Sequence, residues 1–111
     1  MQMVISHAYT KDAAAADAYI ALSASFDGFL AEQDGFVSRT LVQLEDDPTH
    51  LINLRVFRSV DDYEAMTAIP AYRDHIAALS ELVDVDRYAD GYPRSYADVV
   101  VTTVDAWRPS S

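Results

Sequence analysis

The chain has 111 residues, half of them hydrophobic, and carries 18 acidic against 8 basic side chains, which gives a formal net charge of −10 at pH 7. This size and composition indicate a single globular domain spanning residues 1–111. The absence of cysteine excludes a disulfide scaffold, a thiolate metal site and thiol catalysis, and the negative charge repels phosphate backbones, so we expect no binding to nucleic acid.

The sequence carries no targeting signal that we recognise. Residues 1–10 have neither a basic flank nor a long apolar run, so we expect no signal peptide. No segment approaches the roughly 20 consecutive apolar residues of a membrane-spanning helix, so we expect no membrane association. Because a chain without cysteine also suits a reducing compartment, these features favour a cytoplasmic protein.

The first predicted elements are a strand and a helix. Residues 3–9 alternate in the manner of a strand, and His7 shares one face with Met3, Ile5 and Tyr9. Asp12, with Thr10 before it, offers N-cap oxygens for a helix that we expect to run to about residue 33. Gly28 is the weak point of that helix, and Asp34-Gly35 should end it, because glycine readily adopts the left-handed conformation of a C-cap.

A hairpin follows, with strands predicted over residues 36–45 and 50–58 and a turn at residues 46–49. On the second of these strands Asn53, Arg55 and Phe57 share one face with Leu51, whereas Ile52, Leu54 and Val56 form the other. Both faces carry large apolar side chains, but the chain supplies helices for only one. The uncovered face needs a partner surface, and we expect a second copy of the chain, in a homodimer.

The next segment predicts two short helices. Ser59, followed by Asp62, is typical of a helix N-cap, and Met66 lies on the inner side of the helix that follows. Pro70 should end or kink that helix, because proline lacks an N–H and restrains the residue before it. Tyr72 and His75 then begin a second apolar stripe that continues to residue 83.

Residues 84–95 form a predicted loop, which we interpret either as a lid over a binding site or as an acidic connector. Residues 96–107, ending in Trp107, predict a last strand. The resulting order, β-α-β-β-α-β, is that of the ferredoxin-like α+β fold.

Two short motifs resemble the antibiotic biosynthesis monooxygenase superfamily. They are the Asp34-Gly35-Phe36-Val37-Ser38 run before the second strand and the Pro70-Ala71-Tyr72-Arg73-Asp74-His75 run on the last helix, with VFRS-x-D-x-Y-x-A between them. The resemblance covers residues 3–83 and the last strand. It implies a ferredoxin-like subunit, two of which form a dimeric α+β barrel with a pocket between each sheet and its helices.

Members of the superfamily carry out different reactions, so the resemblance does not fix one. The leading interpretation is a cofactor-independent monooxygenase acting on a hydrophobic aromatic or polyketide-like small molecule. The alternatives are a polyketide cyclase or isomerase using the same pocket, and a non-catalytic dimer that binds a small molecule. Haem degradation is disfavoured, because Ile5 and Met66 stand where that branch has Asn and Trp. No nucleotide-binding motif and no zinc or calcium spacing is present, so neither cofactor nor metal is expected.

Three side chains are candidates for catalysis. His75 and His7 could transfer protons, because imidazole titrates near neutral pH. A structural role in the core is the alternative for His75, and packing at the helix layer is the alternative for His7. Arg55 could hold an enolate or phenolate oxygen, since guanidinium keeps its charge, or it could pair with a carboxylate across a dimer interface.

Five further residues are candidates for substrate contact. Asn53 would place a substrate oxygen, and the others would form an apolar wall on which a flat molecule could stack: Phe57, Met66, Tyr72 and Trp107. The alternative for the aromatic side chains is ordinary core packing.

Overall fold

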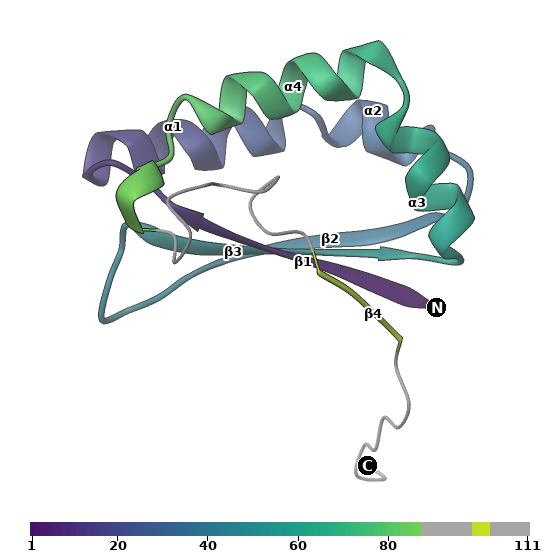
Figure 1. Cartoon of the computed structure of the whole chain (residues 1–111), viewed down its shortest axis with the longest axis horizontal. Coiled ribbons are helices and arrows are strands. Elements are labelled where there is room, and N and C mark those ends of the chain that lie inside the picture. Colours follow the sequence, from purple (N-terminus) through teal and green to yellow (C-terminus); the bar gives the residue numbers. More distant parts are fainter. Residues whose placement is uncertain (88–98, 103–111) are drawn as a thin grey trace, which may run out of the picture.

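The computed structural model describes residues 1–87 and 99–102, which form a four-stranded antiparallel sheet with helices on one face (Figure 1). The strands are β1 (Gln2–Tyr9), β2 (Phe36–Gln43), β3 (His50–Phe57) and β4 (Val99–Thr102), in the sheet order β2-β3-β1-β4. The helices are α1 (Ala13–Ala24), α2 (Asp27–Ala31), α3 (Val60–Thr67) and α4 (Pro70–Ser80), followed by the 3₁₀ helix η1 (Val85–Arg87). This arrangement confirms the predicted ferredoxin-like α+β fold.

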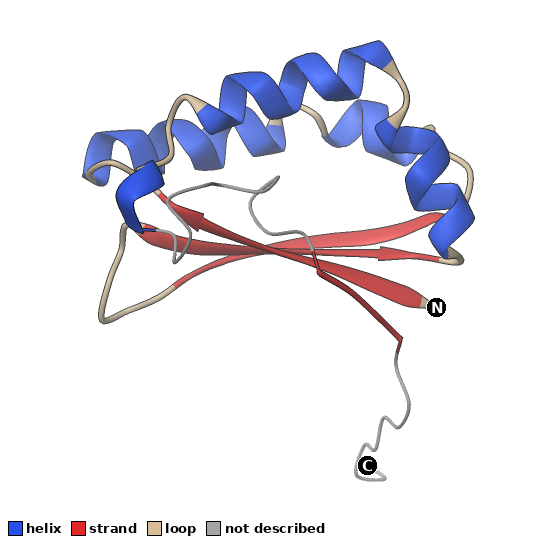
Figure 2. Ribbon diagram, in the orientation of Figure 1, coloured by secondary structure: helices blue, strands red, loops and turns tan. Residues whose placement is uncertain are grey.

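The register of the two central strands decides which side chains face the helices. β1 and β3 pair with Met3 opposite Val56 and Tyr9 opposite His50. Every second side chain of these strands lies beneath the helices and is buried (Val4, Ser6, Ala8, Leu51, Asn53, Arg55 and Phe57). The opposite face, which we call the open face, carries partly exposed side chains (Met3, Ile5, His7, Tyr9, Ile52, Leu54 and Val56). Figure 2 shows α1, α2, α3 and α4 on the other side of the sheet.

β2 pairs with β3, but the pairing is interrupted near the start of β2. Its ladder with β3 shifts register between Phe36 and Ser38, so Val37 is an extra residue that bulges out of the strand. Beyond the shift, Arg39 lies opposite Arg55 and Leu41 opposite Asn53. Arg39 and Leu41 therefore extend the helix-covered face towards the β2 side of the sheet.

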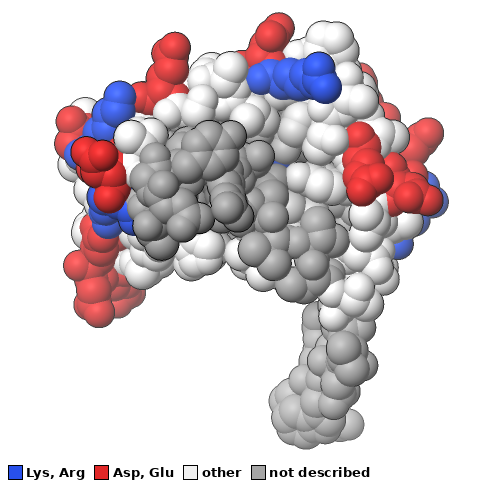
Figure 3. Space-filling view, viewed as in Figure 1, with Lys and Arg blue, Asp and Glu red and all other residues white. Residues whose placement is uncertain are grey.

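Two groups of apolar side chains form the core between the sheet and the helices. One contains Ala8, Ala16, Tyr19, Leu51, Leu79 and Val83, and the other contains Val4, Leu30, Phe57, Met66 and Tyr72. Ile76 of α4 packs against both groups. Most of the charged side chains visible on the surface in Figure 3 are acidic, in keeping with the net charge of −10.

The first helical segment differs from its prediction. Instead of one helix to residue 33, α1 ends at Ala24 and α2 begins at Asp27. The backbone tightens at the break, where the Phe26 N–H donates to the Ser23 carbonyl at 3.2 Å and the Ser25 hydroxyl donates to the Leu22 carbonyl at 2.6 Å. Serine side chains compete with helical hydrogen bonds in this way. Gly28, the predicted weak point, lies within α2.

The predicted helix starts are confirmed. Asp12 accepts the Ala15 N–H at 2.7 Å, and the Ser59 hydroxyl accepts the Asp62 N–H at 3.2 Å. Pro70 separates α3 from α4 and is the first residue of α4, where its missing N–H has no helical partner to lose.

Part of the predicted C-terminal structure lies outside the described residues. Of the predicted loop at 84–95 only residues 84–87 are described, and of the predicted strand at 96–107 only Val99–Thr102. Trp107 is also outside the described residues. Within residues 1–87 and 99–102, no helix is long and apolar enough to cross a membrane.

Gly35 provides a test of the chain reversal before β2. Its φ is +78°, and a Cβ there would overlap the Asp62 side chain. Gly35→Ala should lower the free energy of unfolding by at least about 1–2 kcal/mol, the cost of the left-handed conformation for an L-residue. The matched control is Gly28→Ala, which has nothing within 4 Å of the new Cβ and should stabilise α2 by about 0.5–1 kcal/mol. Urea denaturation measures both, and equal midpoints for the two variants would contradict the role of Gly35.

Candidate active site

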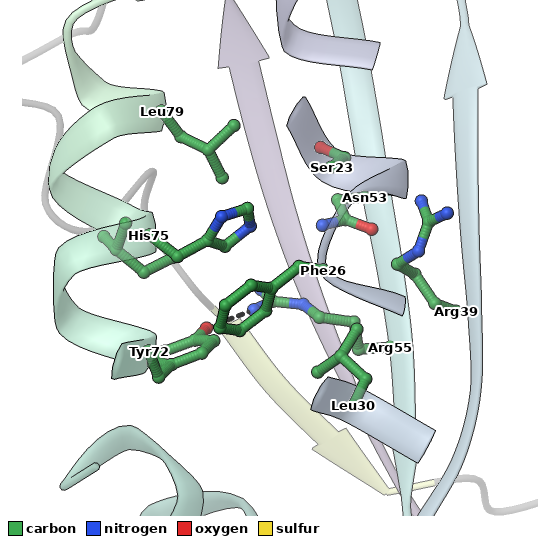
Figure 4. A pocket seen from close by; sticks show the side chains of 10 residues that line it. Ser23, Phe26, Leu30, Arg39, Asn53, Arg55, Tyr72, His75 and Leu79 are labelled. Carbon is green, nitrogen blue, oxygen red and sulfur yellow. Dashed lines mark hydrogen bonds between the residues drawn. The ribbon is translucent and has the colours of Figure 1, made fainter. Parts of the chain in front are cut away.

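A small cavity lies between the sheet and the helices, lined by members of both core groups (Figure 4). Its volume is about 20 Å³, room for about one water-sized group. We call it the inner cavity, and its lining consists of Ser23, Phe26, Leu30, Arg39, Asn53, Arg55, Tyr72, His75, Ile76 and Leu79.

Arg55 brings a permanent positive charge to this cavity. The side chain projects from β3 beneath the helices, and the residue is only 4% exposed. One terminal nitrogen donates to the Tyr72 hydroxyl of α4 at 2.6 Å, and the other donates to the Ser6 hydroxyl of β1. Hydrogen bonds to a charged group are stronger than those between neutral groups. They hold the guanidinium in one orientation and connect both central strands to α4.

His75 supplies a titratable group to the same cavity. Its imidazole stacks on the Phe26 ring, with centroids 4.0 Å apart and planes 2° from parallel. Burial lowers the pKa of His75, and the positive charges of Arg55 and Arg39 lower the pKa further. The neutral imidazole therefore dominates at neutral pH, and a neutral imidazole can accept a proton.

Two polar residues complete the lining on either side of the cavity. Ser23 of α1 is 3% exposed and Asn53 of β3 is 8% exposed. The Ser23 Oγ and the Asn53 Oδ1 are buried, yet neither makes a hydrogen bond to the described residues. We did not predict a role for Ser23, although its helical spacing from Tyr19 and Phe26 indicates an inward position.

A larger groove lies between α1 and the β2 side of the sheet. Its volume is about 350 Å³, and we call it the outer groove. Its lining comprises Ile20, Ala24, Arg39, Leu41, Val42, Gln43 and Leu51. Arg39 lines both spaces and is held by Asp27 through hydrogen bonds of 2.8 and 3.1 Å. This ion pair joins α2 to β2 where the two spaces adjoin.

The structure brings four of the predicted site residues together in the inner cavity: Asn53, Arg55, Tyr72 and His75. Phe57 and Met66 lie in the second core group and do not line the cavity. Trp107 is outside the described residues. Whether any of these residues contacts a substrate stays a prediction.

His7 lies apart from this group. Ser6 and Ala8 face the helices, so strand alternation puts His7 on the open face. Neither a place in the pocket beneath the helices nor packing at the helix layer is therefore correct for His7. Its Nδ1 is instead 3.0 Å from the Nε2 of His50, on the neighbouring strand β3.

The surroundings of this histidine pair are aromatic and charged. The Tyr9 ring lies 4.3 Å from the His50 ring, and the Arg87 guanidinium lies 5.0 Å above Tyr9. Arg87 also forms an ion pair with Asp47 at 2.6 Å. Burial lowers the pKa of His50, and the neighbouring His7 lowers the pKa further. Among residues 1–87 and 99–102, no group of three or more His, Asp or Glu side chains could hold a metal ion.

Comparisons with known proteins identify the family. Residues 1–78 match the model of the antibiotic biosynthesis monooxygenase family, and the chain belongs to that family. No curated protein matches the chain significantly.

Solved structures show the same fold at low sequence identity. The monooxygenase from the gene ActVA-Orf6 of Streptomyces coelicolor, in complex with nanaomycin D, has a TM-score of 0.78 and 20% identity, over 98% of this chain and 92% of that chain. SnoaB, a cofactor-independent oxygenase from Streptomyces nogalater, has a TM-score of 0.70 and 21% identity, over 98% and 96% of the two chains. Rv0793 from Mycobacterium tuberculosis has a TM-score of 0.71 and 20% identity, over 96% and 98%.

The Phe26–His75 stack predicts how the pKa of His75 responds to exposure. Phe26→Ala should raise this pKa towards its ordinary value of about 6.5, because water would reach the imidazole and stabilise its charged form. An NMR titration of the imidazole carbon-bound protons measures the change. Ile20→Ala is the control, since Ile20 lines the outer groove and not the inner cavity. An unchanged pKa in Phe26→Ala would show that the stack does not shield His75.

The lowered pKa of His75 also determines whether the fold becomes more or less stable as the pH falls. Folded His75 binds a proton less readily than unfolded His75. The contribution of this residue to stability is therefore complete above about pH 6.5 and declines as the pH falls below that value. Phe26→Ala should reduce this decline.

Proposed function

We propose that this protein is a cofactor-independent monooxygenase acting on a hydrophobic aromatic small molecule. The proposal is based on one observation: the neutral imidazole of His75 and the buried cation of Arg55 line the same cavity. The chain also belongs to the antibiotic biosynthesis monooxygenase family. The names of two proteins of the same fold support it, since SnoaB is a cofactor-independent oxygenase and ActVA-Orf6 is a monooxygenase with nanaomycin D bound.

The residues of the inner cavity suit the first step of such a reaction. His75 accepts a proton from an acidic C–H or O–H group of the substrate, and Arg55 stabilises the negative charge that develops on the substrate oxygen. Both groups are held in position before the reaction, His75 by its stack on Phe26 and Arg55 by its bonds to Ser6 and Tyr72. Orientation and the exclusion of water are therefore the contributions of the protein.

The substrate anion then supplies the electrons. For a methylene group between aromatic rings, the carbanion reduces dioxygen, a C–O bond forms and the O–O bond breaks. The overall balance is R₂CH₂ + O₂ → R₂C=O + H₂O, with the proton on His75 returned to the oxygen that leaves as water. A cyclase or isomerase would use the same base and cation without dioxygen. A binding protein would carry out neither the proton transfer nor the reaction with dioxygen.

Oxygen uptake with a tricyclic anthrone tests this proposal. Wild-type protein should consume one O₂ for each anthrone oxidised, and His75→Ala should lower turnover by about 10²–10⁴-fold, the usual contribution of general acid–base catalysis. A structural His75 would give unchanged turnover with a lower melting temperature. Conversion of the anthrone without oxygen uptake would favour a cyclase or isomerase. If His7→Ala lost turnover and His75→Ala did not, the reaction would take place on the open face.

We also propose that the open face is covered by a second copy of the chain. Large apolar side chains from both central strands lie partly exposed on this face, and the helices α1 to α4 pack on the other. A surface of this kind is typical of an interface in a small domain.

A charge placed in the middle of the open face tests the homodimer. Leu54→Asp should produce monomers, because the carboxylate would lose its hydration in the interface. Ala78→Asp, on the exposed side of α4, is the control and should leave the assembly intact. Sedimentation velocity at micromolar concentration measures both. A wild-type protein that sediments as a monomer, or a Leu54→Asp variant that stays dimeric, would contradict an interface at this face.

A further inference from the structure

The wall of the inner cavity combines hydrogen-bond donors with positive charge. Its polar lining includes the hydroxyl of Ser23, the amide of Asn53 and the guanidinium groups of Arg39 and Arg55, and no Asp or Glu among the described residues lines it. Most of the remaining wall is apolar or aromatic (Phe26, Leu30, Ile76 and Leu79). A group that accepts hydrogen bonds and carries negative charge therefore suits this lining.

The Ser23 hydroxyl indicates that the cavity is built for such a group. A serine on a helix usually bonds to a carbonyl of the preceding turn, as Ser25 does with Leu22 at 2.6 Å. Ser23 is 3% exposed, yet its Oγ makes no hydrogen bond to the described residues. Buried hydroxyl groups are hydrogen-bonded with few exceptions, so the Ser23 O–H is available as a donor to a group in the cavity.

The two arginines make the electrostatic potential of the cavity positive. Arg55 is 4% exposed, so water screens its charge poorly. Arg39 is paired with Asp27, but Asp27 does not line the cavity and its side chain is 55% exposed, so its charge is screened by solvent. Both arginines lower the pKa of His75, and no carboxylate of the described residues opposes them. The positive field therefore reaches across the cavity.

The size of the cavity limits the ligand to a small ion. Its volume of about 20 Å³ exceeds the roughly 10–15 Å³ that one water needs, so an ion somewhat larger than water fits, whereas a carboxylic acid does not. The Asn53 amide carries two N–H donors, and Figure 4 shows its nitrogen turned towards His75 and its oxygen towards Arg39. The amide can therefore donate to an ion on the His75 side.

We propose that the inner cavity is a binding site for a monatomic, monovalent anion such as chloride, held by the Ser23 hydroxyl and the Asn53 amide in the field of Arg39 and Arg55. The site exists in the protein at rest and does not depend on the reaction. One consequence rests on the proposed function. Because Arg55 would stabilise the substrate oxyanion in the same cavity, chloride and that oxyanion exclude one another.

Replacement of gluconate by chloride at constant ionic strength tests the site, since gluconate carries the same charge and is too large for the cavity. Chlorine NMR line broadening measures binding. Wild-type protein should bind chloride saturably. Ser23→Ala should weaken chloride at least about tenfold, because it removes a hydrogen bond to a charged group. Arg39→Gln should also weaken chloride, because it keeps hydrogen-bond donors but removes the charge.

Ser38→Ala is the matched control, because Ser38 is an exposed serine on β2 that does not line the cavity. Its affinity for chloride should equal that of the wild type. Ser23→Ala should fold, since alanine favours a helix more than serine does, and circular dichroism checks this. No saturable binding in the wild type, or equal affinities in the wild type, Ser23→Ala and Arg39→Gln, would overturn the inference. The cavity would then hold a structural water only.

A second measurement tests whether the ion lies beside His75. Chloride should raise the pKa of His75 relative to its value in gluconate, because a nearby negative charge favours the imidazolium and offsets the effect of Arg55 and Arg39. NMR titration follows all three histidines. The pKa values of His7 and His50, which lie on the open face, should not change. An unchanged pKa of His75, or an equal rise at all three histidines, would contradict binding in the cavity.

Oxygen uptake separates this inference from the proposed function. If both hold, chloride should raise the KM for the anthrone and leave kcat unchanged, and an unchanged KM would contradict the shared position of the two anions. Chloride binding in a protein that consumes no oxygen would leave the anion site intact and remove the monooxygenase. Oxygen uptake by a protein that does not bind chloride would do the reverse.

Discussion

The buried guanidinium of Arg55 is the constraint on which the arrangement of this molecule depends. A charge in the interior is costly unless hydrogen bonds satisfy it, and the partners here come from two other elements, Ser6 on β1 and Tyr72 on α4. The bond to Tyr72 fixes how α4 lies over the sheet. His75 follows Tyr72 by almost one helical turn, so the same bond also fixes the imidazole over the cavity. Loss of either partner would leave the charge undersolvated, and loss of Tyr72 would also remove the hydrogen bond between β3 and α4.

Much of this arrangement could be predicted from alternation and from residues with special backbone properties. The period of two on β3 places Asn53, Arg55 and Phe57 on one face, because neighbouring side chains of a strand point to opposite sides. Pro70 starts α4 because its missing N–H is tolerated only in the first turn. The apolar stripe of α4 then places Tyr72 and His75 on the side of the helix that faces the core, and the structure places both in the cavity.

Other features depend on contacts that alternation cannot describe. The break between α1 and α2 comes from the side chain of Ser25 and a tightened turn at Phe26, and these bring the Phe26 ring to His75. Alternation also groups His7 with Tyr9 without saying which face the helices cover. The structure decides between the two faces, because the helices cover Ser6 and Ala8. Phe57 and Met66 lie on the helix-covered side as predicted, but both belong to the second core group and neither lines the cavity.

The bulge at Val37 has a consequence for how the molecule meets other chains. β2 lies at the end of the sheet, and the outer backbone groups of such a strand are a template for another strand. Val37 is 45% exposed, and a residue of this kind on a regular edge would favour stacking of sheets into fibres. The extra residue instead interrupts the ladder next to Phe36 and increases the local twist. A strand from another chain could pair in regular register only with residues 38–43. The bulge therefore disfavours edge-to-edge polymerisation through β2.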